Sequence, residues 1–248
     1  MGSITISLIA LAFVFGGALL GMFLRTALPQ QHLSDASKDI VRLAAGLVVT
    51  MCALTLGLLV SSAKSAYDRQ SIELTEVSAK IIFLDRILAH YGPETKEARE
   101  LLRADVFHVL DQVWSERHTK LDPSSVGVDV LYDKIQELSP KDEAQRSIRA
   151  EALGLAMAVG QTRWLMYEQR ATTVSKPLLV MLVFWLTIVF ASFGLFAPKN
   201  PLVVASLFVS ALAVSGAILL ILEMYTPYGG LIQISSAPLR AALAQLGR

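Results

Sequence analysis

The sequence predicts an all-α membrane protein: four transmembrane helices, with a helical cytoplasmic domain inserted between the second and the third. Two observations predict this fold class. First, hydrophobic residues make up 54% of the 248 residues, which is too apolar for an ordinary water-soluble domain of this size. Second, nearly all acidic residues lie within residues 61–176; the exceptions are Asp35, Asp39 and Glu223.

The first apolar run, residues 4–24, is long enough to span a hydrocarbon core of roughly 30 Å. A signal peptide is the alternative interpretation. It is disfavoured because no basic segment precedes the run, and because no small-residue cleavage site follows it before Arg25. Gly17 and Gly21 form a GxxxG pair, which permits close contact with another helix.

The second apolar run, residues 43–60, begins a helix that we expect to extend from residue 39 to residue 91. The chain becomes polar after Val60 without meeting a proline, and Gly92 and Pro93 then stop the helix. One seam of residues alternates steps of three and four, which keeps it on one side of a helix. We expect this seam to pack an assembly of helices together: Ala53, Leu56, Val60, Ala63, Tyr67, Gln70, Leu74, Val77, Ile81, Leu84, Leu88 and Tyr91.

The charged stretch, residues 61–176, is predicted to be helical throughout. It shows neither the strict alternation of apolar and polar residues nor the turn residues that a β-hairpin needs. Glu94 and Glu97 suit the start of one helix after Pro93. Ser139 before Pro140 predicts another start, with serine at the N-cap and proline at the first helical position. Near the C-terminus, Pro238 marks a short helix that we expect to be docked rather than free.

The third and fourth spans, residues 178–196 and 202–222, are joined by a tight loop, so they run antiparallel. Four spans place both termini on the side of the charged domain. Basic residues near the membrane favour this side as the cytoplasm, because they outnumber those on the other side. The expected divisions are residues 1–60 for the first two spans, 61–176 for the cytoplasmic domain, 177–224 for the last two spans and 225–248 for a cytoplasmic tail.

Several classes of function lack support in the sequence. The four histidines show no metal-ligand spacing, and there is no nucleotide-binding glycine loop or nucleophile elbow. We therefore expect no enzyme, no catalytic residue, no metal and no cofactor. A net charge of +1 gives no reason to expect nucleic acid. The single cysteine, Cys52, lies in an apolar run and predicts at most a buried thiol.

Four stretches carry a resemblance to a known family: HLSDASKDIVRLAAGL, GLLVSSAKSAYDRQ, LDRILAHYGPETKEARELLR and SSAPLRAALAQLGR. Together they resemble the bacterial bestrophin-like family of unknown function, nearly throughout the chain from His32 onward. The layout also resembles the true bestrophins, which are pentameric anion channels whose second helices line the pore. The chain lacks their acidic calcium-binding cluster, so calcium gating is not expected. The resemblance implies a multi-pass protein of the bacterial inner membrane.

Two hypotheses follow from this resemblance. The first is a homo-oligomeric ion channel, with a pentamer favoured, that passes inorganic anions. If the seam packs against neighbouring helices, the opposite stripe lines the pore: Met51, Leu54, Leu58, Ser61 and Ser65. Leu54 and Leu58 would form a constriction that gates by dewetting, and Lys64 and Arg69 would concentrate anions at the cytoplasmic mouth. The second is a non-conducting membrane scaffold or sensor whose cytoplasmic helices bind a partner. For any one leucine, contact with lipid or another span remains an open alternative.

Overall fold

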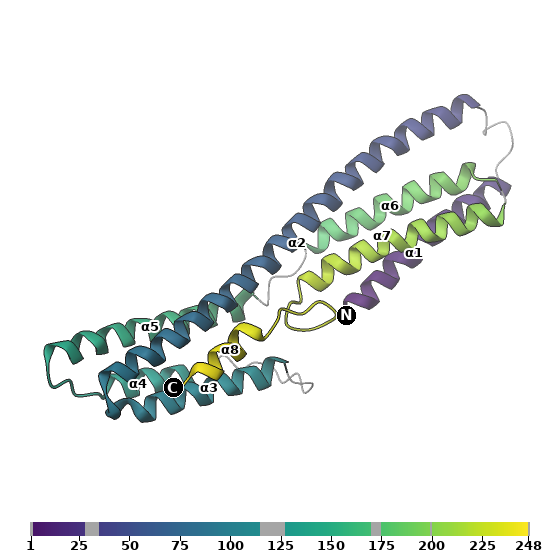
Figure 1. The fold of residues 1–248 in the computed structure, drawn as a ribbon. Helices are drawn as coiled ribbons and strands as arrows, with labels where there is room; N and C mark the ends of the chain where they lie inside the picture. The colour runs from purple at the N-terminus through teal and green to yellow at the C-terminus, as the bar shows by residue number, and fades with distance from the viewer. Residues whose placement is uncertain (1, 28–34, 115–126, 170–174, 199, 248) are drawn as a thin grey trace. The chain divides into compact units, whose positions relative to one another are not determined.

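The structure, a computed structural model, describes residues 2–27, 35–114, 127–169, 175–198 and 200–247. Within these ranges every regular element is a helix (Figure 1). The elements are α1 Ser3–Ala27, α2 Asp35–Tyr91, the 3-10 helix η2 Pro93–Thr95, α3 Lys96–Trp114, α4 Gly127–Gln136, α5 Glu143–Gln169, α6 Lys176–Phe196, α7 Pro201–Met224 and α8 Ala237–Gln245.

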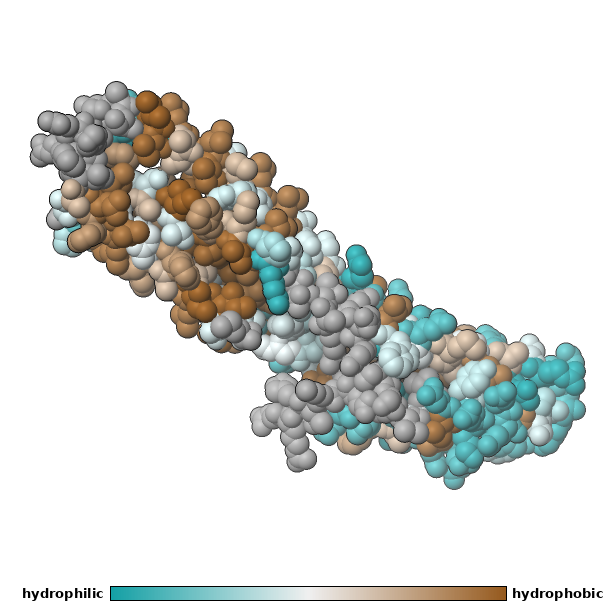
Figure 2. Space-filling model, turned by 180° about the vertical axis from the view of Figure 1, so that it is seen from behind, coloured by the Kyte–Doolittle hydropathy of each residue, from teal (hydrophilic) through white to brown (hydrophobic). Residues whose placement is uncertain are grey.

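Four helices, α1, α2, α6 and α7, are long and apolar enough to cross a membrane. The prediction of an all-helical chain with four spans is therefore confirmed. The chain divides into two compact units. Met1–Ala66 and Thr173–Tyr225 form one, here called the apolar unit, and Tyr67–Thr172 and Thr226–Arg248 form the other, the polar unit. In Figure 2, hydrophobic residues cover most of the visible face of the apolar unit, whereas hydrophilic residues gather on that of the polar unit.

In the apolar unit, α1 packs against both α6 and α7. The contact with α6 depends on glycines that let the two backbones approach. A Cβ atom on Gly21 would lie 2.0 Å from the carbonyl oxygen of Ala191, and one on Gly194 would lie 2.0 Å from that of Ala18. The other member of the GxxxG pair, Gly17, is also buried at this contact. Small residues thus hold α1 against α6 where lipid supplies no hydrophobic driving force.

In the polar unit, the C-terminal part of α2 supplies the seam that forms the core. Leu84 and Leu88 are fully buried, in one cluster with Leu102 of α3, Ala152 of α5 and Leu239 of α8. From Gln70 to Tyr91 the seam therefore packs within its own chain, and the expectation that it joins subunits is wrong for this part. The physical reason is that α3, α5 and α8 bury apolar side chains against this part of α2.

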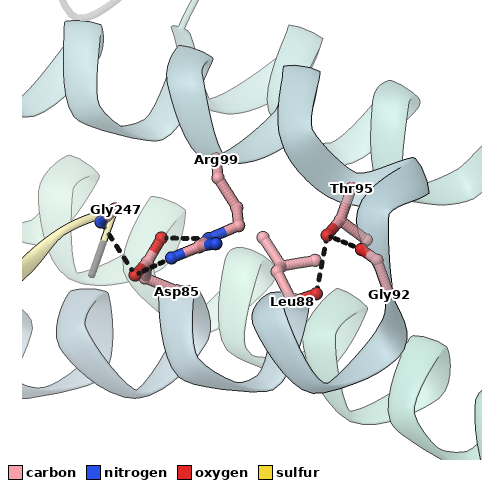
Figure 3. A network of polar contacts seen from close by, with 6 residues as sticks. All are labelled: Asp85, Leu88, Gly92, Thr95, Arg99 and Gly247. Carbon is pink, nitrogen blue, oxygen red and sulfur yellow. Dashed lines mark hydrogen bonds and ion pairs between the residues drawn. The ribbon is translucent and has the colours of Figure 1, made fainter.

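The docked tail is tied to α2 by a buried carboxylate. Asp85 is 1% exposed, and its oxygens accept hydrogen bonds from Arg99 Nε at 2.8 Å and Nη2 at 2.9 Å (Figure 3). The backbone N–H of Gly247 donates to the same carboxylate at 3.2 Å. The hydrogen bond to Asp85 raises the pKa of Arg99, which keeps the guanidinium charged. The prediction of a docked C-terminal helix fits this arrangement.

Side chains next to the end of α2 and the start of α5 pair with the free backbone groups there. The hydroxyl of Thr95 lies 2.6 Å from the carbonyl oxygen of Leu88 and 2.8 Å from that of Gly92, so it satisfies acceptors at the end of α2 (Figure 3). The expected start of α5 at Ser139 is wrong, because the helix begins at Glu143. Asp142 caps it, since its Oδ1 accepts from the backbone N–H of Gln145 at 2.7 Å.

Candidate pore-lining face

One face of α2 is left uncovered by the rest of its own chain. Met51, Leu54 and Leu58 are 44%, 66% and 72% exposed, and Ser61 and Ser65 are also exposed. Steps of three, four, three and four residues place these five side chains along one side of a helix with 3.6 residues per turn. The structure therefore brings all five predicted pore-lining residues together on one exposed stripe, here called the α2 stripe.

The opposite face of the same helix packs inside the apolar unit. Cys52, Leu59 and Ala63 are buried in a cluster that includes Leu182 and Leu186 of α6. Cys52 is a free thiol there, as expected. This packing fixes how α2 is rotated about its own axis, and it turns the α2 stripe away from the other spans.

The two predicted basic residues differ in their relation to the stripe. Both Lys64 and Arg69 are exposed. Arg69 follows Ser65 by four residues and lies on the same side of the continuous helix α2. Lys64 directly precedes Ser65, and its side chain therefore lies about 100° away from that of Ser65 around the helix axis. Only Arg69 thus extends the α2 stripe with a positive charge.

Two polar groups at the C-terminal end of α7 were not predicted as part of the site. The hydroxyl of Tyr225 lies 3.0 Å from the hydroxyl of Ser62, which links the end of α7 to α2 beside the stripe. Glu223, two residues earlier, is 4% exposed. The sequence signal for this region was Glu223 itself, the one acidic residue next to the last two predicted spans, because an acid near lipid usually has a specific environment.

The chemistry of the α2 stripe is that of an apolar surface followed by hydroxyls. Its first three side chains carry no charge and offer no oxygen ligand to an ion, and the next two are serines. Among the described residues, no group of three or more His, Cys, Asp and Glu side chains is placed to hold a metal ion. The stripe is therefore apolar along its first part and carries hydroxyl groups along the part that follows.

The model of the Bestrophin-like domain matches residues 12–239, which covers most of the chain, including all four candidate spans in large part. No curated protein matches the chain significantly, and neither does any solved structure.

Proposed function

Because the chain belongs to the Bestrophin-like family, we propose that it is a homo-oligomeric ion channel of the inner membrane that conducts anions along α2. Membership supports a channel rather than an enzyme, since bestrophins are anion channels. The observation that carries the proposal is the α2 stripe, because a single chain leaves this face of α2 uncovered. Several copies of the chain, five by analogy with the bestrophins, would assemble around a central pore, and the α2 stripe of each copy would line it.

The stripe suggests how such a pore would close. Rings of Leu54 and Leu58 would form an apolar constriction, and a narrow apolar passage expels water, so that an ion cannot cross while hydrated. Ser61 and Ser65 would line the wider, wetted part that follows. Arg69 would lie at the mouth of the passage and raise the local concentration of anions there.

Chloride efflux from liposomes tests this proposal. We expect vesicles of phosphatidylcholine that contain the purified protein to release chloride once valinomycin is added. Valinomycin lets potassium leave as well, so that no opposing membrane potential builds up. The variants Leu54→Ala and Leu58→Ala should raise the flux, because each widens the passage and lowers the penalty for wetting it. Leu20→Ala is the matched control, because Leu20 is 57% exposed on α1 and lies outside the stripe.

The possible results separate the assignments. If the parent conducts and neither α2 variant changes the flux, Leu54 and Leu58 do not form the gate. If Arg69→Glu fails to lower the permeability of chloride relative to potassium, the residue does not attract anions. A protein that is reconstituted intact and conducts nothing would favour the alternative function, a membrane scaffold or sensor whose polar unit binds a partner.

A further inference from the structure

Helix α2 separates from the other spans near its N-terminal end. Between residues 41 and 51 only Ala45 is buried, and Leu43 and Leu47 are 77% and 68% exposed. Farther along, Cys52 and Leu59 are packed at 5% exposure each. Figure 1 shows the same divergence, with the N-terminal end of α2 standing apart from α6.

A groove of about 220 Å³ lies where the two helices diverge. Val41 and Ala45 of α2 form one wall, and Phe193 and Phe196 of α6 form the other. Ser192 adds little polarity, because its hydroxyl already donates to the carbonyl oxygen of Ile188 at 2.9 Å. The interior of the groove is thus apolar and suits a hydrocarbon chain.

The rim of the groove is positively charged. Arg42 lines it directly, and its ion pair with Asp39 spans 3.8 Å between side chains that are 71% and 72% exposed. An exposed ion pair of this kind is weak, so the guanidinium of Arg42 keeps hydrogen-bond donors available for another anion. Arg25 of α1 donates to the carbonyl oxygen of Ala197, which also lines the groove. The two guanidinium groups and the carboxylate of Asp39 together carry a net charge of +1, and Lys38 adjoins them in the sequence.

The sequence places both arginines at the depth where a lipid phosphate lies. Arg25 directly follows the apolar run 4–24, and Arg42 directly precedes the run 43–60. The headgroup layer begins where such runs end. Guanidinium groups bind phosphate through paired hydrogen bonds, and basic pockets between transmembrane helices hold anionic headgroups.

We propose that this groove is a binding site for an anionic phospholipid. One acyl chain lies between Phe193 and Ala45, and the phosphate rests against Arg42 and Arg25. A zwitterionic lipid is bound more weakly, because its headgroup adds no net charge to neutralise the rim. The site lies on the face of the apolar unit where α2 leaves α6, and it does not depend on whether the protein conducts ions.

Fluorescence quenching by brominated lipids tests the site. Phe196→Trp in a Trp185→Phe background places a reporter in the groove, in phosphatidylcholine vesicles that contain brominated phosphatidylglycerol or brominated phosphatidylcholine. Trp114 and Trp164 remain, so the signal of the reporter is the quenching in excess of that in Trp185→Phe alone. We expect brominated phosphatidylglycerol to occupy the groove about five times more readily than brominated phosphatidylcholine. This is the ratio of affinities that one basic residue near a membrane surface produces. Arg42→Gln should remove the preference. Arg86→Gln, which changes an exposed arginine of the polar unit, should retain it.

Three results would overturn the proposal. Equal quenching by the two lipids would show that the rim does not select an anion. An unchanged preference in Arg42→Gln would remove that arginine from the site. Absence of quenching by either lipid would show that protein covers the groove, as a second copy of the chain would. If the reporter variant does not fold, native mass spectrometry of the unmodified protein and of Arg42→Gln measures the retained phosphatidylglycerol, and equal retention would refute the site.

Discussion

At the scale of single residues, Asp85 shows how the polar unit uses a buried charge. Its carboxylate is neutralised by Arg99, whose side chain is 21% exposed, and it also accepts the N–H of Gly247. Burial of a carboxylate is costly unless it is paired and hydrogen-bonded, and here both conditions hold. The pair therefore links α2, α3 and the end of the tail at one point.

We predict that Asp85→Ala destabilises the polar unit by about 3–5 kcal/mol, because it leaves a half-buried guanidinium without its carboxylate. The amides of residues 237–247 should also exchange hydrogen faster, since Gly247 loses its acceptor. Thermal unfolding in detergent and hydrogen–deuterium exchange measure the two effects. Glu143→Ala is the control, because its pair with Arg146 is exposed and contributes about 1 kcal/mol at most. Unchanged exchange in the tail would refute the link.

At the scale of helices, the contact between α1 and α6 depends on the absence of side chains. The glycine pair in the sequence only permitted such a contact, and it did not say which helix would be the partner. In the structure the partner is α6, which offers a glycine of its own at position 194.

We predict that Gly21→Ala destabilises this contact by about 1–3 kcal/mol, because the added Cβ meets backbone that cannot turn aside. The matched control is Gly16→Ala, since a Cβ on Gly16 meets nothing within 4 Å. Thermal unfolding of the two variants in the same detergent makes the comparison. Equal melting temperatures would show that α1 and α6 are not held by this close approach.

The helix α2 shows what sequence periodicity can and cannot predict. The period of the apolar residues correctly placed Met51, Leu54 and Leu58 on one face, and Gly92 correctly marked the end of the helix. The period could not say what each face contacts. Leu84 and Leu88 pack within the chain because α3, α5 and α8 fold back onto them, and these contacts come from distant parts of the sequence. Likewise, the groove beside Arg42 arises from divergence of two helices, which no local pattern records.

At the scale of the whole molecule, the orientation in the membrane decides which end of the proposed pore faces the cytoplasm. Basic residues near the membrane are more numerous on the side of the polar unit, and this favours a cytoplasmic location for it. In this proposed orientation, four spans would place both termini in the cytoplasm as well. The loop between α6 and α7, which includes Pro198, would lie on the other side.

We predict that a membrane-impermeant maleimide added to intact cells labels Pro198→Cys but not Gln161→Cys, and that permeabilised cells label both. Both positions are exposed, so differences in labelling report the side of the membrane rather than burial. The native thiol gives little background, because Cys52 is 5% exposed, and Cys52→Ser removes it entirely. Labelling of Gln161→Cys alone in intact cells would reverse the topology. Arg69 would then face the outside, and the proposed anion-attracting mouth would be the outer one.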